Sequence, residues 1–283
     1  MKKKRVQAKN KFVEREIRMI SRETLDKFIE YINTSKRIVF FGGAGVSTES
    51  GIPDFRSKDG LYNQKDVDFA EYSPEYLLSQ ECLYHNPKVF FAFYRQKMDT
   101  RNVQPNVTHK VLAKLEECGK LSAVITQNID GLHQKAGSKK VYEIHGTTRK
   151  NYCTKCGARY GENFIFESKD VIPRCPECGG MVRPDVVLYG ENVQHEKEAV
   201  TEIYNADMLI VGGTSLQVYP ANSYVDVFRG RHMAVVNRED VGVKIGKEDV
   251  FIQESLGEVF EEVLSRARTK NAPILYRYYP ALH

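Results

Sequence analysis

The chain has 283 residues, enough for one large domain or two modest ones, and its 41% hydrophobic and 28% charged residues are ordinary proportions for a soluble protein. No apolar run approaches the roughly 18 residues that a membrane-spanning helix needs, so we expect no membrane segment. The net charge is +5, but eight basic and two acidic side chains within residues 1–18 account for it, and the nearly neutral remainder argues against a nucleic-acid-binding protein.

The first residues form a basic stretch that has the positive start of a signal peptide but no apolar segment after it. We therefore expect residues 1–20 to be a basic tail that leads into the first helix, and we expect a cytoplasmic protein. A solvated tail is the plain interpretation of such a run, and contact with anionic partners is the alternative.

Short apolar segments that end in Gly, Asn or Gln are typical of buried parallel strands. The chain has four of them, at residues 37–41, 123–126, 208–211 and 233–236. Amphipathic patterns predict helices at residues 24–32, 107–118 and 258–267. This alternation predicts an α/β fold with a doubly wound, Rossmann-like parallel sheet, built from residues 21–150 and 183–270.

Two stretches interrupt the alternation. Residues 52–106 are rich in Tyr and Phe and have helical periodicity near 74–79 and 87–97, so they predict a helical insertion over the ligand edge of the sheet. Residues 150–182 have little periodicity and predict a small separate module. Residues 271–283 hold two prolines and three tyrosines and predict a tail that packs on the surface or is disordered.

Glycine-rich turns follow two of the predicted strands. The first turn contains Gly43, Ala44 and Gly45. Such a turn before a helix N-terminus can bind a phosphate, but the third glycine of the dinucleotide fingerprint is missing, so an ordinary strand-to-helix turn explains it equally well. The second turn contains Gly213, Thr214 and Ser215. Asn237 ends the strand at 233–236, where ribose binding and turn formation are both open interpretations.

Polar side chains also follow the predicted strand at 123–126 and a further alternating segment that ends at residue 144. Gln127, Asn128 and Asp130 come directly after residues 123–126 and could hold a ligand amide or ribose, although turn formation explains Asn and Asp as well. His145 follows an alternating strand and precedes a glycine. A lone histidine is more often structural, but it titrates near neutral pH, and its place near the same sheet edge makes it the best general base in the sequence.

Four of the six cysteines form two Cys-x-x-Cys pairs, separated by eighteen residues. They are Cys153, Cys156, Cys175 and Cys178. In a cytoplasmic protein this spacing predicts zinc ligation and not disulfides. Four thiolates saturate a tetrahedral zinc ion, so we expect the zinc to be structural and the chemistry to occur elsewhere.

Six separated motifs resemble, in order, those of the sirtuins, the NAD-dependent protein deacylases. They are GAGVSTESGIPDFR at residues 43–56, TQNID at 126–130, His145-Gly146, the cysteine quartet, Gly190-Glu191 and GTSL at 213–216. The likeness extends from about residue 24 to about residue 267. It implies an enzyme that moves the acyl group of a protein lysine to ADP-ribose and releases nicotinamide, with acetyl-lysine preferred.

The resemblance also implies a role for each matched residue. The NAD pyrophosphate would lie against Gly43, Ala44 and Gly45. A mobile loop over the nicotinamide ribose would contain Phe55 and Arg56. Asn128 and Asp130 would line the nicotinamide pocket, and Gln127 would contact the ribose beside His145, the general base. The adenosine side would be bound by Gly213, Thr214, Ser215 and Asn237. The acyl-lysine channel would be lined by Val186, Val187 and Tyr189, the last standing where the family usually has Phe.

The expected cofactors are NAD and one structural zinc ion, and the expected partners are acylated-lysine proteins or peptides bound by a monomer. Two alternatives remain open. One is a mono-ADP-ribosyltransferase that uses the same NAD site. The other is a regulator that binds nucleic acid through the zinc module, for which residues 149–183 offer seven basic and four acidic side chains, only a modest excess.

Acyl-chain preference depends on residues 94–97. Sirtuins that favour malonyl- or succinyl-lysine resemble one another in a Tyr-x-x-Arg pair that binds the acyl carboxylate. Here Tyr94 is present but the fourth residue is Lys97, which lacks the bidentate fork of arginine, and Arg95 should face a different side of the helix. A neutral acyl chain is therefore expected. The alternative interpretation makes Tyr94 a core residue and Lys97 a solvated charge.

Overall fold

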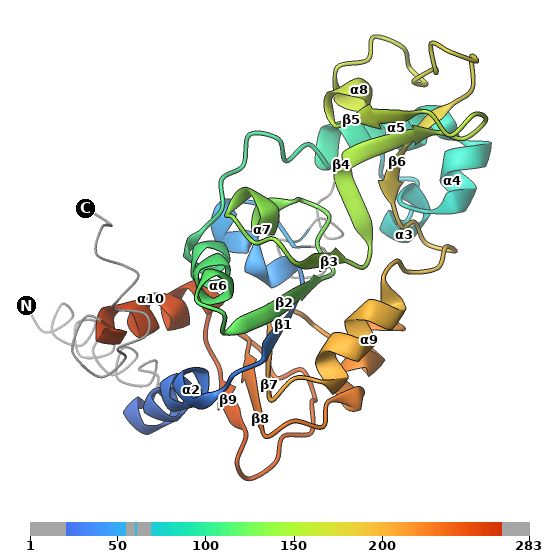
Figure 1. Cartoon of the computed structure of the whole chain (residues 1–283). Coiled ribbons are helices and arrows are strands. Elements are labelled where there is room, and N and C mark those ends of the chain that lie inside the picture. The colour runs from blue at the N-terminus through green and yellow to red at the C-terminus, as the bar shows by residue number, and fades with distance from the viewer. Residues whose placement is uncertain (1–20, 55–59, 61–68, 268–283) are drawn as a thin grey trace, which may run out of the picture.

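The computed structural model of the chain describes residues 21–54, 60 and 69–267 (Figure 1). The predictions for the basic N-terminal tail, the loop residues Phe55 and Arg56, and the C-terminal tail lie outside the described residues. None of the described helices is long and apolar enough to cross a membrane.

Six parallel strands form the main sheet. They are β1 (Ile38–Gly42), β2 (Leu121–Thr126), β3 (Val141–Glu143), β7 (Met208–Gly212), β8 (His232–Val236) and β9 (Val250–Ile252). Their spatial order is β3-β2-β1-β7-β8-β9, and every pairing is parallel. In chain order this is the arrangement 3-2-1-4-5-6 of dinucleotide-binding sheets, which confirms the predicted fold class.

Helices cover both faces of this sheet (Figure 1). One face carries α2 (Arg22–Thr34), α6 (Val107–Glu117) and α10 (Leu256–Ala267); the other carries α9 (Glu196–Tyr204) and η5 (Ala221–Val227). Side chains alternate along a strand, so Ile38 and Phe40 of β1 pack on the first face while Val39 and Phe41 pack on the second. The continuous apolar runs in the sequence follow from this two-sided burial.

The helix ends also follow from local sequence. The predicted helix at 107–118 is α6, which begins at an Asn106 cap that accepts a hydrogen bond from the Thr108 N–H. It ends before Gly119, whose φ of 70° is the left-handed conformation that a glycine after a helix supplies readily.

The two insertions form one small lobe beside the sheet (Figure 1). The first supplies α3 (Pro74–Leu77), α4 (Gln80–His85) and α5 (Pro87–Lys97). The second supplies α8 (Asn163–Phe166) and an antiparallel sheet in the order β5-β4-β6, made of Arg159–Gly161, Gly146–Cys153 and Val182–Val186. Phe90 and Tyr94 of α5 share a hydrophobic core with Ile165, Val186 and Leu188. The sequence patterns do not reveal this shared core.

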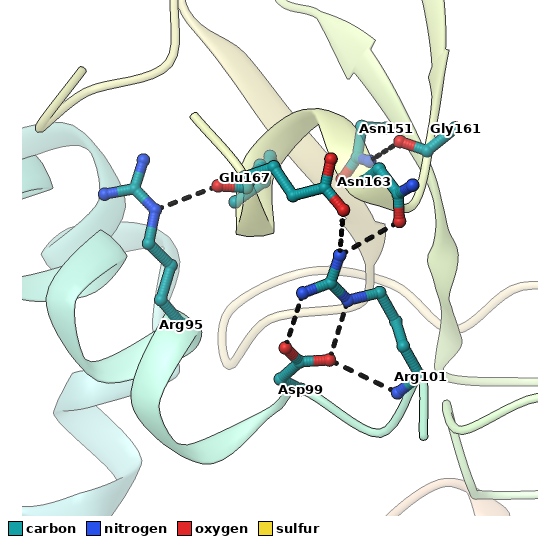
Figure 2. A network of polar contacts seen from close by, with 8 residues as sticks. Arg95, Asp99, Arg101, Asn151, Gly161, Asn163 and Glu167 are labelled. Carbon is teal, nitrogen blue, oxygen red and sulfur yellow. Dashed lines mark hydrogen bonds and ion pairs between the residues drawn. The ribbon is translucent and has the colours of Figure 1, made fainter. Parts of the chain in front are cut away.

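Two arginines of the helical insertion form hydrogen bonds with the predicted zinc module, residues 150–182 (Figure 2). Arg101 pairs with Asp99 and with Glu167, both at 2.8 Å, and donates to the Asn163 side chain at 3.0 Å. Arg95 donates to three backbone carbonyls, those of Ile165, Asp170 and Val171, at 2.9, 2.7 and 3.1 Å. Because one side chain satisfies several groups of the other segment, these contacts fix the two insertions relative to each other.

Two histidines are buried side by side between α6 and α7 (Leu132–Lys135). The rings of His109 and His133 have centroids 4.7 Å apart, and that of Phe40 lies 6.1 Å from His133. Neither ring nitrogen of His133 has a hydrogen-bond partner among the described residues. Burial lowers the pKa of His109 to about 4, and burial together with repulsion from His109 lowers the pKa of His133 well below its usual value. Both rings are therefore neutral at pH 7.

We expect the free energy of unfolding to fall as the pH drops below about 6.5, because the unfolded chain then binds protons that these two rings do not bind in the folded state. A depressed folded-state pKa gives stability that is complete above the unfolded value and is lost below it. Each such group costs up to about 1.4 kcal/mol per pH unit, and for His109 the loss continues down to a pH of about 4. Urea unfolding over this pH range measures the slope. His133→Phe should make the slope shallower by about one proton, and an unchanged slope would contradict the assignment.

Candidate active site and zinc site

The predicted ligand-binding residues meet at the carboxyl edge of the main sheet, where β1 and β7 lie side by side at the point where the strand order reverses. The two glycine turns pack against each other there. The Gly45 N–H donates to the Gly213 carbonyl at 2.8 Å, and a Cβ on Gly45 would lie 2.8 Å from the Gly213 Cα. Gly213 itself has a φ of 59°. Both glycines are therefore required because the two backbones approach closely, in the crevice where such sheets bind nucleotides.

The sequence predicted a helix directly after the first turn, and this prediction is wrong. Two short 3-10 segments follow instead, η1 (Ala44–Val46) and η2 (Thr48–Ser50). Gly51, with a φ of 89°, ends the second one, and Pro53 would prevent a longer helix from continuing. The backbone N–H groups available to a phosphate therefore belong to this short turn region.

A chain of hydrogen bonds links three side chains behind the first turn. The Asn128 Nδ2 donates to the Ser47 Oγ at 3.0 Å, and the Ser47 hydroxyl donates to the Asp130 carboxylate at 2.7 Å. The Leu132 N–H donates to the other oxygen of Asp130 at 2.9 Å. Burial raises the pKa of Asp130, and these hydrogen bonds oppose the rise. Asn128 and Asp130 thus have fixed orientations.

Ser47 is the residue of this site that sequence reasoning missed. Its side chain is buried and connects β2 to the turn after β1. The only signal in the sequence was a hydroxyl residue after a glycine turn, which local turn and cap formation explains just as well.

Gln127 and the second glycine turn are joined across the crevice. The Gln127 Nε2 donates to the Thr214 Oγ1 at 2.9 Å, so the ends of β2 and β7 are connected through buried Thr214. Ser215 next to it is exposed. The Asn237 Nδ2 donates to the Glu239 carbonyl at 2.8 Å, a contact of the kind that a turn-forming asparagine makes.

His145 stands where the main sheet ends and the small lobe begins. Its Nδ1 lies 3.0 Å from the Gln127 carbonyl oxygen. Because a carbonyl oxygen only accepts, Nδ1 carries the hydrogen and Nε2 is the basic nitrogen. The next residue, Gly146, has a φ of 77°, and any Cβ there would collide with the Asp185 carbonyl. The glycine therefore lets β4 start immediately after the histidine.

The predicted substrate residues lie in a segment between His145 and the helical insertion. The Val187 N–H donates to the His145 carbonyl at 2.8 Å, and the Tyr189 N–H donates to the Leu78 carbonyl at 3.0 Å. Val186 is buried, Val187 is half-buried and the Tyr189 side chain is 38% exposed. This segment therefore connects the general-base candidate to the small lobe through backbone hydrogen bonds.

The four predicted cysteine ligands converge at one end of the small sheet. All four sulfur atoms lie within 4.8 Å of one another, with Cys153 to Cys178 at 3.5 Å and Cys156 to Cys175 at 3.6 Å. Zinc–sulfur bonds of about 2.3 Å in a tetrahedron put the sulfurs about 3.8 Å apart, so these residues fit a zinc ion.

Each Cys-x-x-Cys pair is a tight turn of the same design. The Gly157 N–H donates to the Cys153 carbonyl at 3.0 Å, and the Gly179 N–H donates to the Cys175 carbonyl at 2.9 Å. The Tyr160 hydroxyl lies 3.0 Å from the Cys175 sulfur, where it can donate to a thiolate.

The fold and the site define a nucleotide-binding α/β protein with a separate zinc module, and the comparisons identify its family. The model of the Sir2 family matches residues 43–220. An NAD-dependent protein deacetylase of Clostridium perfringens is 49% identical over 246 residues, 86% of this chain and 99% of that protein. A Sir2–p53 peptide–NAD+ structure has a TM-score of 0.73 and 35% identity, and covers 86% of this chain and 98% of its own.

A structure of Sir2 with the inhibitor EX-527, 2′-O-acetyl-ADP-ribose and deacetylated p53 peptide has a TM-score of 0.73 and 33% identity, over 85% of this chain and 98% of its own. The chain belongs to the Sir2 family, which confirms the resemblance identified in the sequence.

Proposed function

We propose that the protein is an NAD-dependent protein-lysine deacetylase that transfers the acyl group to ADP-ribose and releases nicotinamide. The observation that carries the proposal is the hydrogen bond between the Nδ1 of His145 and the Gln127 carbonyl, which leaves Nε2 as the basic nitrogen of a histidine that follows β3 of the main sheet. Relatives named for this activity, and Sir2 structures named for NAD and for acetyl-ADP-ribose, support it.

The residues divide the work as follows. NAD, when bound, would supply the electrophilic carbon and the nicotinamide leaving group. Asn128 and Asp130, held by Ser47, orient the carboxamide end of the cofactor. His145 takes up a proton at Nε2 from the ribose hydroxyls beside Gln127. The two glycine turns and Asn237 would hold the pyrophosphate and the adenosine, through Gly43, Ala44, Gly45, Gly213, Thr214 and Ser215. The substrate lysine enters past Val186, Val187 and Tyr189.

The test is incubation of the protein with an acetyl-lysine peptide, with and without NAD, followed by mass measurement of all products. We expect free lysine, nicotinamide and O-acetyl-ADP-ribose only when NAD is present. ADP-ribosylated protein without loss of acetyl would instead support the mono-ADP-ribosyltransferase alternative. A salt-dependent shift of DNA without any turnover would support the nucleic-acid-binding alternative.

The zinc module also bears on where the protein acts. Its four thiols need a reducing compartment to remain zinc ligands and not form disulfides, and all six cysteines are free in the structure. We therefore propose a cytoplasmic location.

A neutral acyl group should be preferred over a carboxylated one. Tyr94 is fully buried in the small-lobe core, where its ring stacks between Phe90 and Phe166 at centroid distances of 5.9 and 5.4 Å. Its hydroxyl has no hydrogen-bond partner among the described residues, and burial raises its pKa. The guanidinium of Arg95 already donates to three carbonyls of the zinc module, so it is not available to an acyl carboxylate. Lys97 has no guanidinium and cannot make a bidentate contact with one.

The measurement for this prediction is kcat/KM on matched peptides that differ only in the acyl group. We expect acetyl-lysine to be processed better than succinyl-lysine. A succinyl preference of about tenfold or more, roughly 1.4 kcal/mol in transition-state binding, would contradict the assignment and indicate a bound acyl carboxylate.

A further inference from the structure

A buried ion pair contacts residues 186–189, the segment that contains the predicted substrate residues, which we call the substrate segment. Arg183, on β6, and Glu191, which follows the segment, have side chains only 4% and 20% exposed. The two guanidinium nitrogens Nη1 and Nη2 meet the two carboxylate oxygens at 2.5 and 2.9 Å, which is the bidentate arrangement of a fork on a carboxylate. Glu191 belongs to the Gly190-Glu191 motif, to which neither the sequence nor the catalytic site gives a role.

Both members of the pair also hold the backbone of the segment. The Arg183 Nη2 donates to the Val186 carbonyl at 2.9 Å, and the Glu191 carboxylate accepts from the Leu188 N–H at 2.9 Å. The Glu191 N–H in turn donates to the Leu188 carbonyl at 2.9 Å, through a turn in which Gly190 has a φ of 94°. The ion pair therefore holds the backbone of the segment at two points, the Val186 carbonyl and the Leu188 N–H.

Two further backbone hydrogen bonds, described above, hold the same segment to its neighbours. Val187 is bonded to the His145 backbone, and Tyr189 is bonded to Leu78 of the helical insertion. A shift of the segment would thus change the distance between the acyl-lysine channel and His145. Placement errors of about 1 Å at a reacting centre can cost on the order of 10²-fold in rate.

Stability alone does not account for a charged pair in this position. Burial alone would raise the pKa of Glu191, but the hydrogen bonds from Arg183 and Leu188 lower it overall, so the carboxylate is ionised. Replacing a buried ion pair by apolar side chains of similar volume is often neutral or stabilising. What an apolar pair cannot supply is the set of directed hydrogen bonds to the Val186 carbonyl and the Leu188 N–H.

We propose that Arg183 and Glu191 are positioning residues for the acyl-lysine substrate: they hold residues 186–189 in register with His145 without touching the reacting atoms. This inference rests on the proposed deacetylase function. NAD contacts lie at the other strand ends, so the pair acts on the peptide side of the reaction and not on the cofactor side.

The experiment compares Arg183→Met, Glu191→Leu, the double variant carrying both changes, and Arg183→Lys. Each is assayed for melting temperature and for the KM of an acetyl-lysine peptide and of NAD. We expect the single variants to melt lower, because each leaves one buried charge without its partner. We expect the double variant to melt between the single variants and wild type, because no charge is left without its partner but the Val186 carbonyl and the Leu188 N–H lose theirs. Its peptide KM should stay at least about tenfold above wild type, with the NAD KM within about threefold. Arg183→Lys should restore the peptide KM only in part, since lysine lacks the fork.

A matched control lies at the opposite edge of the sheet. Glu202 accepts hydrogen bonds from Arg37, Lys140 and Ser122 at the amino ends of the strands. Glu202→Gln should lower the melting temperature without changing either KM.

A double variant with a wild-type peptide KM, or with both KM values raised alike, would overturn the positioning role. An inactive wild-type enzyme in the same assay would instead count against the deacetylase function itself.

Discussion

Replacing His145 with alanine should leave a folded protein that binds NAD and yet deacetylates an acetyl-lysine peptide at least about 10²-fold more slowly. The substitution removes the Nε2 that accepts the proton, while the backbone hydrogen bond from Val187 to residue 145 remains available. Gly146 and the start of β4 are unaffected for the same reason. The measurement is kcat with saturating NAD and peptide, together with NAD binding by calorimetry.

His85→Ala is the control for this variant, because His85 is an exposed histidine on α4 away from the strand ends. Its turnover should equal that of wild type. Near-normal turnover in His145→Ala would remove the histidine from the mechanism, and loss of NAD binding would show a role in the cofactor site instead of a proton transfer.

Replacing Cys175 with serine should reduce zinc below one ion per chain and lower the melting temperature, with loss of activity as a consequence. A serine hydroxyl is a poor replacement for a thiolate on zinc. Cys175 is buried against Cys153 and Val182, and Phe164 of the module contacts both this cluster and the small-lobe core, so the damage should spread beyond the metal site. Zinc content by atomic emission and the melting temperature are the two measurements.

Cys118→Ser provides the comparison, because Cys118 is a half-buried free cysteine at the end of α6 and outside the quartet. It should keep one zinc ion per chain. If Cys175→Ser stayed folded and active without zinc, the structural role of the metal would be wrong.

The main sheet could be predicted because its strands are buried on both faces and therefore appear as uninterrupted apolar runs, as in β1 and β7. β9 was not predicted. Its three residues, Val250–Ile252, give too short a run to stand out between polar loops. The helix expected after Gly45 was also wrong, since Gly51 and Pro53 end the regular structure within two short turns.

The candidate site was predictable as a set of strand ends, because parallel strands deliver their carboxyl ends to one edge. The hydrogen bonds within the site could not be predicted. That Ser47 joins Asn128 to Asp130, or that Arg183 supports Val186, depends on side-chain directions set by tertiary packing. The shared core of the two insertions was equally invisible, because each segment alone has only a weak pattern.

That shared core has a consequence for the order in which the protein can be completed during synthesis. Phe90 and Phe91 of α5 pack with Val186 and Leu188, which emerge from the ribosome roughly a hundred residues later. Until then the apolar side of the helical insertion lacks the partner that buries it. Contacts of such long sequence separation form slowly because a large loop must close first. The core of the small lobe can therefore be completed only after residue 188 has emerged, although α3, α4 and α5 are made before β2.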